Sequence, residues 1–137
     1  MIDKKFVENV FAIAETKHEE DDLIRRTLNP ISYLKEYRTI TLSLGRQKGH
    51  STHFVEYLRD KNTLYIALQK EEYARRWQLK RDLVHTKETY EKVLRGSIRK
   101  FDYILIDVTL KWSLRDKNKL YNILCGRGLA PLVIFLS

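Results

Sequence analysis

The chain of 137 residues is 43% hydrophobic and 32% charged, with a formal net charge of +8. This length and composition indicate one globular domain and exclude a disordered chain. No apolar run approaches the ~20 residues of a membrane-spanning helix, and the single cysteine cannot form an internal disulfide. These features favour the cytoplasm, which for a viral protein is the host cytoplasm.

The charge is unevenly distributed along the chain. Residues 1–22 contain seven acidic and three basic residues, a net −4, so the remaining residues carry +12. Because lysine and arginine release condensed counterions when they contact phosphates, this basic excess predicts a nucleic-acid partner. A protein partner or a homo-oligomer is also compatible with it, whereas a membrane partner is not expected.

The first part of the chain is expected to be helical. Apolar residues recur at helical spacing from Phe6 to Ala14 and predict an amphipathic helix over residues 3–18. A short helix is expected to begin at Asn29–Pro30, because asparagine caps helices and proline is tolerated in their first position. We expect residues 1–37 to form a helical extension before an α/β core over residues 38–137, within one domain.

Apolar runs and helical segments alternate after residue 38. Four runs predict strands: TITLSL (39–44), TLYIAL (63–68), YILIDV (103–108) and PLVIFL (131–136). Helices are predicted over residues 52–60, from 71 to about 95, and from 114 to about 124. This alternation predicts an α/β fold with a parallel sheet of about four strands, covered by helices in a three-layer arrangement.

The loop after the first predicted strand reads GRQKGHST over residues 45–52. Its glycines permit close backbone approach to a ligand, and the following helix start directs free N–H groups towards an anion. The usual phosphate-binding loop is G-x-x-x-x-G-K-[ST], in which the final hydroxyl binds magnesium. The candidate phosphate-binding residues are Gly45, Arg46, Gln47, Lys48, Gly49, His50, Ser51 and Thr52.

Two positions of this loop depart from the usual pattern. Leu44 stands at the first glycine, and His50 stands at the lysine that contacts the β and γ phosphates. Histidine is shorter than lysine and mostly neutral at pH 7. Arg46 and Lys48 can supply part of the missing charge. A tight turn with surface charges is the alternative interpretation of the same residues.

The stretch YRTITLSLGRQKGHST resembles the Walker A region of phage terminase large subunits, the ATPases that package DNA. The loop of that family reads R-Q-x-G-K-[ST]. Five residues match it: Arg46, Gln47, Gly49, Ser51 and Thr52. The resemblance covers roughly residues 30–137 and implies a P-loop ATPase domain in viral DNA metabolism or packaging, with ATP and magnesium as ligands.

The stretch FDYILIDVTLKW is similar to the family's Walker B strand, which ends in Asp-Glu. Asp107 stands at the aspartate position and Val108 at the glutamate position. The resemblance implies that Ser51 and Asp107 hold magnesium, and that Asp107 is the catalytic residue if the protein is active. The final LVIFLS, which ends at Ser137, is similar to the start of the family's next strand.

Together the two departures predict a degenerate site. Without the lysine, the γ-phosphate loses its main neutralising charge, and without the glutamate no residue orients the attacking water. We therefore expect binding of a nucleotide or phosphate group with weak or no hydrolysis. Two alternatives remain: a non-enzymatic module that binds nucleic acid or protein on the same scaffold, and an ATPase that uses unusual residues.

The segment from residue 70 to residue 100 is the most basic part of the chain, with ten lysine or arginine residues and five acidic ones. The candidate contacts to a nucleic-acid backbone are Arg75, Arg76, Lys80 and Arg81. Tyr73 and Trp77 are candidates for base stacking. Trp77 also has the spacing of a core residue, so packing against the fold is the competing interpretation.

Overall fold

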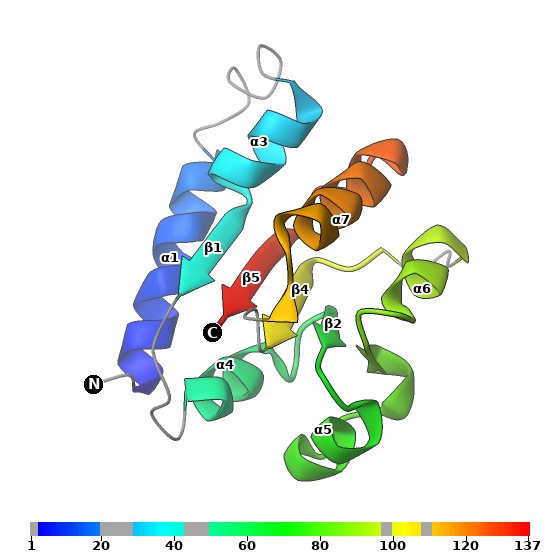
Figure 1. Cartoon of the computed structure of the whole chain (residues 1–137). Helices are drawn as coiled ribbons and strands as arrows, with labels where there is room; N and C mark the ends of the chain where they lie inside the picture. Colours follow the sequence, from blue (N-terminus) through cyan, green and yellow to red (C-terminus); the bar gives the residue numbers. More distant parts are fainter. Residues whose placement is uncertain (1–2, 20–28, 43–49, 97–99, 108–110) are drawn as a thin grey trace.

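The computed structural model describes residues 3–19, 29–42, 50–96, 100–107 and 111–137. Helices cover both faces of one parallel sheet (Figure 1). The helices are α1 (Lys4–Glu19), α3 (Pro30–Tyr37), α4 (His50–Leu58), α5 (Lys70–Trp77), α6 (Tyr90–Gly96) and α7 (Leu114–Gly126). The strands are β1 (Thr39–Leu42), β2 (Thr63–Ile66), β3 (Val84–His85), β4 (Tyr103–Asp107) and β5 (Leu132–Leu136), and a 3-10 turn, η1 (Arg81–Leu83), precedes β3.

The five strands lie in the order β1-β5-β4-β2-β3, and every neighbouring pair is parallel. All residues of β2 and β5 are buried, which explains why these strands are continuous apolar runs in the sequence. The predicted α/β class with a parallel sheet is confirmed, and the four predicted strands are β1, β2, β4 and β5. The fifth strand, β3, was not predicted.

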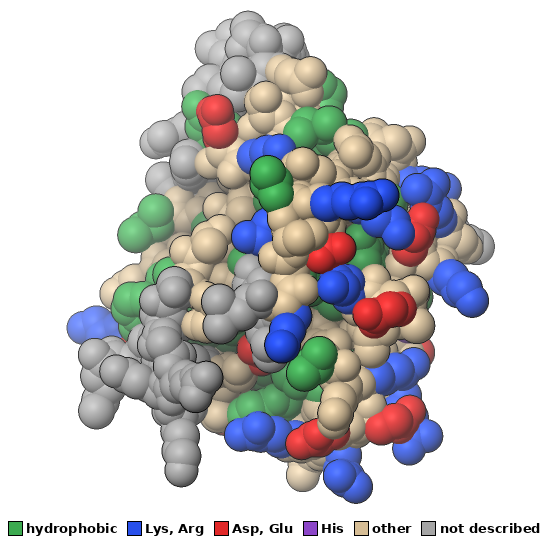
Figure 2. Space-filling model, viewed as in Figure 1, with side chains coloured by type: hydrophobic (Ala, Val, Ile, Leu, Met, Phe, Trp, Pro, Cys, Tyr) green, Lys and Arg blue, Asp and Glu red, His purple; other side chains and the backbone are tan. Residues whose placement is uncertain are grey.

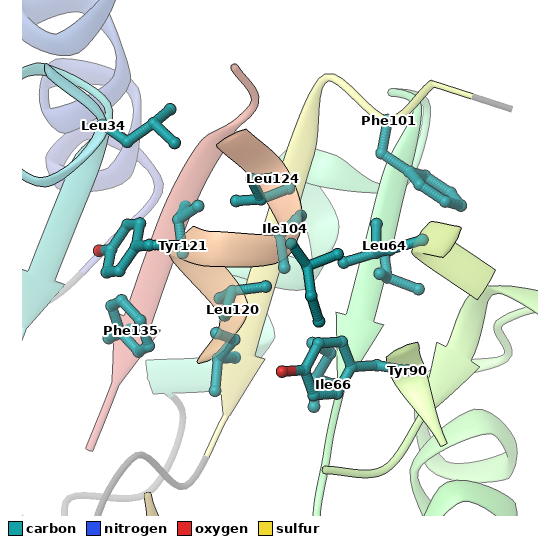
Figure 3. Close-up of a cluster of buried hydrophobic side chains, with 14 of the residues drawn as sticks. Leu34, Leu64, Ile66, Tyr90, Phe101, Ile104, Leu120, Tyr121, Leu124 and Phe135 are labelled. Atoms are coloured by element: carbon teal, nitrogen blue, oxygen red, sulfur yellow. The ribbon is translucent and has the colours of Figure 1, made fainter. Parts of the chain in front are cut away.

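The core consists of two clusters of buried side chains, one on each face of the sheet. In the first cluster, side chains of α3, α6 and α7 pack on one face of the sheet; Leu34, Tyr90 and Leu120 come from these helices and Ile104 from β4 (Figure 3). In the second cluster, side chains of α1, α4 and α5 pack on the opposite face. Helices α1 and α3 therefore belong to the two helical layers, because each of them buries apolar residues against the sheet.

Each helix that connects two parallel strands lies on the face of the sheet that corresponds to the direction of the connection. The connections β1–α4–β2 and β2–α5–β3 move towards β3 in the sheet, and their helices belong to the second cluster. The connections β3–α6–β4 and β4–α7–β5 move towards β1, and their helices belong to the first cluster. A single handedness requires this arrangement, because reversing the direction of a crossover moves its helix to the other face.

The helix predicted from residue 71 to about residue 95 is wrong. The structure has α5, η1, β3 and α6 in its place. Helix α5 ends because Gln78 adopts a left-handed conformation with φ of 54°, and Leu79 then donates a backbone hydrogen bond to the carbonyl of Ala74. Val84 follows Trp77 by seven residues, the spacing of one helix face, but it belongs to the edge strand β3 and pairs with Tyr65 of β2.

Several helix ends follow the sequence signals. Asn29 caps α3 by accepting a hydrogen bond from the Ile31 backbone, as predicted. Ser113 and Asp116 form a reciprocal capping box at the start of α7. Gly128, with φ of 65°, turns the chain from α7 towards β5. No helix within the described ranges is long and apolar enough to cross a bilayer.

Candidate functional site

The candidate site lies at the carboxyl edge of the sheet. Leu136 of β5 pairs with Leu42 of β1 on one side and with Asp107 of β4 on the other. Three strands therefore end at one level, and their arrowheads point to the same edge in Figure 1. Ligands bind beyond this edge in open α/β sheets. Helix α4 begins at this edge with His50, and the first turn of a helix directs backbone N–H groups beyond its end.

The central observation is a direct contact between the two predicted magnesium ligands. The Ser51 hydroxyl donates a hydrogen bond of 2.7 Å to Oδ2 of Asp107. Strands β1 and β4 are not neighbours, because β5 lies between them. Ser51 nevertheless reaches Asp107 because it lies nine residues beyond the end of β1, in the first turn of the helix that crosses towards β2.

Tyr73 is a third member of the site that the sequence did not predict. Its hydroxyl donates a 3.1 Å hydrogen bond to the same Oδ2 of Asp107. Burial, and then the neighbouring Asp107, hold the pKa of Tyr73 well above its usual value of 10, so the hydroxyl stays protonated at neutral pH. The Tyr73 ring lies tilted against Tyr65 and edge-on to Trp77, with ring centroids 6.4 and 6.3 Å away.

The chemistry of the donor set fits a magnesium ion. Mg²⁺ prefers oxygen ligands, and it commonly uses one or two protein oxygens together with waters and substrate phosphates. Adjacent ligands of an octahedron with 2.0–2.1 Å bonds lie about 2.9 Å apart. The 2.7 Å between Ser51 Oγ and Asp107 Oδ2 is within a few tenths of an ångström of that value. Among the described residues no group of three or more His, Cys, Asp or Glu side chains forms a metal cluster.

A cavity of about 180 Å³ gives access to Asp107. Its walls come from the segments that follow β2, β3 and β4, and its lining includes Lys87 and Lys111. The Lys87 ammonium donates hydrogen bonds to the Lys111 carbonyl at 3.1 Å and to Asp116 at 3.3 Å, which fixes the segment after β3 against the start of α7. The lining also includes the acidic Glu88, so basic and acidic side chains share this cavity with Asp107.

Part of the predicted loop lies outside the described residues. Gly45, Arg46, Gln47, Lys48 and Gly49 fall in this part, as does Val108 after β4. His50 is the first residue of α4, and Thr52 is partly buried in its first turn. Ser137 lies at the same edge, where its backbone N–H donates to the Leu42 carbonyl at 3.0 Å.

The four predicted nucleic-acid contacts are exposed around α5 and η1. They are Arg75, Arg76, Lys80 and Arg81. Arg81 forms a 2.9 Å ion pair with Glu71, and the Arg76 guanidinium lies 5.0 Å from the centre of the partly buried Trp77 ring. This surface therefore mixes basic side chains with acidic ones and with one packed aromatic ring.

The sequence matches no protein-family model, and a search of curated proteins found no significant match. The resemblance to terminase large subunits therefore remains a prediction from the motif residues.

Proposed function

We propose that the protein binds a nucleotide, or another phosphate group, together with magnesium at the carboxyl edge of its sheet. The proposal rests on the 2.7 Å contact between Ser51 and Asp107, two residues 56 positions apart that the motif assigned to one metal. Asp107 and Ser51 would hold the ion, which would neutralise phosphate charge. The start of α4 would offer backbone N–H groups to the phosphate oxygens.

Turnover at such a site is expected to be weak or absent. The motif lysine is replaced by His50 and the motif glutamate by Val108. The Tyr73 hydroxyl is protonated, since its pKa is raised, and it donates its hydrogen bond to Asp107. Tyr73 therefore does not replace the glutamate that orients the attacking water. By its motif resemblance we place the protein in viral DNA metabolism or packaging, in the cytoplasm of the host.

Isothermal titration calorimetry tests the proposal. Wild-type protein is titrated with ATP, GTP and a non-hydrolysable ATP analogue, with and without Mg²⁺. We expect saturable, magnesium-dependent binding that is lost in Ser51→Ala. Ser32→Ala serves as the matched control, because Ser32 is also partly buried but lies on α3 in the other helical layer. Absence of binding by any nucleotide to the wild type contradicts the proposal.

A gain-of-function variant gives a second readout. Restoring the motif lysine with His50→Lys should strengthen nucleotide binding, because a permanent charge then reaches the β and γ phosphates. Unchanged affinity would mean that the loop does not hold phosphate as the motif predicts. Phosphate release above background that disappears in Asp107→Ala would instead assign the protein as an active ATPase.

A nucleic-acid partner is our second proposal, and the net charge of +8 favours it. It is compatible with a non-enzymatic role of the same scaffold, in which a protein partner is the other candidate. The two proposals are independent, because calorimetry with mononucleotides tests the first and binding to a duplex tests the second.

A further inference from the structure

Basic side chains are concentrated on one face of the molecule. The described segments 87–95 and 111–127, which build α6 and α7, contain eight basic and three acidic residues, a net +5. Residues 56–82, which include α5, contain seven basic and five acidic residues, a net +2. Figure 2 shows lysine and arginine side chains over α6 and α7, with acidic side chains interspersed among them. The segments that build α6 and α7 therefore carry more net positive charge than the segment that includes α5.

Hydrogen bonds and ion pairs link basic residues of α3, α7 and α6. Lys35 of α3 donates a 3.0 Å hydrogen bond to Asn118 of α7. Lys119, the next residue of α7, forms a 2.8 Å ion pair with Glu91 of α6, which also pairs with Arg95 at 2.8 Å. Arg115 lies one helical turn before Lys119 on the same stripe of α7. We name these six residues the α3–α7–α6 band: Lys35, Glu91, Arg95, Arg115, Asn118 and Lys119.

The band has an excess of positive charge that its own acid does not neutralise. It carries four cationic side chains and one carboxylate, a net +3. Hydrogen bonding from Lys119, and then the charges of Lys119 and Arg95, lower the pKa of Glu91, so this carboxylate is ionised at neutral pH and shared by two cations. Arg115 is exposed, and the contacts of Lys35 are to uncharged groups, namely the Asn118 amide and the Tyr121 ring, whose centroid lies 5.6 Å from the ammonium.

The dimensions of the band fit a run of phosphates. Packed helices lie 8–10 Å apart, so the band extends over about 16–20 Å across the three helices. A nucleic-acid strand advances about 3.4 Å per nucleotide, so this length corresponds to roughly five phosphates. Several cations in a row are complementary to such a repeating negative charge.

The band offers no platform for base stacking. The aromatic side chains beneath it, Tyr121 and Phe135, are buried in the first core cluster. The large apolar side chain exposed near it is aliphatic, namely Leu114. Contacts from such a surface go to phosphates and not to bases, which favours a double-stranded ligand whose bases are already paired.

We propose that the α3–α7–α6 band binds the phosphodiester backbone of a nucleic-acid duplex without reading its sequence. The inference rests on the proposed nucleic-acid partner, but it does not depend on the Ser51–Asp107 site. It predicts which side chains carry the salt dependence of binding, and it places them away from Arg75, Arg76, Lys80 and Arg81.

The test is fluorescence anisotropy with a labelled 20-base-pair DNA duplex at several salt concentrations. The band variant is Lys35→Gln/Arg115→Gln/Lys119→Gln. The control variant is Arg75→Gln/Arg76→Gln/Lys80→Gln, and both variants lower the formal net charge from +8 to +5. Glutamine preserves helix propensity, and urea unfolding of each variant checks the fold. Anionic vesicles containing phosphatidylserine form a parallel arm.

We expect the band variant to bind at least about tenfold more weakly at physiological salt, and its log–log salt slope to fall by about 2.7, or 0.9 for each lost contact. The control variant should change affinity by no more than about twofold. Equal losses in both variants, or a larger loss in the control, overturn the assignment to the band while leaving a nucleic-acid partner in place. No duplex binding by the wild type overturns both. Vesicle binding without duplex binding, lost in the band variant, assigns the surface to a membrane instead.

Discussion

A double-mutant cycle on Ser51 and Asp107 examines the contact at the centre of the site. Hydrogen bonds to a charged group contribute about 1.5–3 kcal/mol to stability. Tyr73 also donates to Oδ2 of Asp107, so this carboxylate keeps one hydrogen bond in Ser51→Ala. We therefore expect Ser51→Ala to lower the free energy of unfolding by about 1.5 kcal/mol, the lower end of that range. Asp107→Ala removes the acceptor of both hydroxyls and should cost about 3 kcal/mol. The double variant should also cost about 3 kcal/mol, which leaves a coupling energy of about 1.5 kcal/mol.

The assay is urea unfolding at pH 7, in EDTA so that no magnesium contributes. The matched control pairs Ser51→Ala with Asp102→Ala, since Asp102 is exposed just before the amino end of the same strand, β4. Changes at distant sites add to within about 0.5 kcal/mol, so this control cycle should show no coupling. A Ser51–Asp107 coupling energy below about 0.5 kcal/mol would refute the contact.

Three further predictions concern the fold. Burial raises the pKa of Tyr65 and of Tyr90 to about 12, so the stability that each neutral phenol contributes is fully present below pH 10 and is lost between pH 10 and 12. At pH 11 each tyrosine should lower the free energy of unfolding, measured in urea, by about 1.4 kcal/mol. The corresponding phenylalanine variant should not show this loss. Gln78→Gly should stabilise by about 0.5–1 kcal/mol because residue 78 has φ of 54°, while Gln78→Ala should not, as measured by denaturant midpoints. Phe11→Ala should lower the free energy of unfolding by about 3–5 kcal/mol, because this α1 side chain is fully buried. Ile13→Ala, at an exposed position of the same helix, should change it by no more than about 0.5 kcal/mol. Equal values for the two variants would place α1 outside the core.

The strands with strong local signals were predictable, and the short edge strand was not. Near-continuous apolar runs identified β2, β4 and β5, because parallel strands covered on both faces require them, and β1 was identified by the alternating run TITLSL. Strand β3 has only two residues, and it is defined by pairing with β2. No glycine or proline marks the end of α5, since the break depends on the left-handed backbone of Gln78. Neither the pairing of β3 with β2 nor the left-handed conformation of Gln78 can be read from the residues of a short segment.

The proximity of Ser51 and Asp107 was predictable because a motif fixed both residue types. Ser51 and Asp107 were assigned to one metal, and the structure brings them into contact. The role of Tyr73 could not be read from the sequence, because its partner lies 34 positions away on another element. The grouping of basic side chains in space could not be read from the sequence either, because counting lysine and arginine along one segment does not reveal that α3, α6 and α7 pack side by side.

The magnesium dependence of nucleotide binding, compared between wild type and Asp107→Asn, tests the central claim most directly. If Asp107 and Ser51 hold the ion against a bound phosphate, removing Mg²⁺ should weaken ATP binding to the wild type by at least about tenfold, a difference of about 1.4 kcal/mol. Asp107→Asn should bind with the weaker affinity whether or not Mg²⁺ is present. A variant that keeps the full magnesium dependence of the wild type would contradict the account.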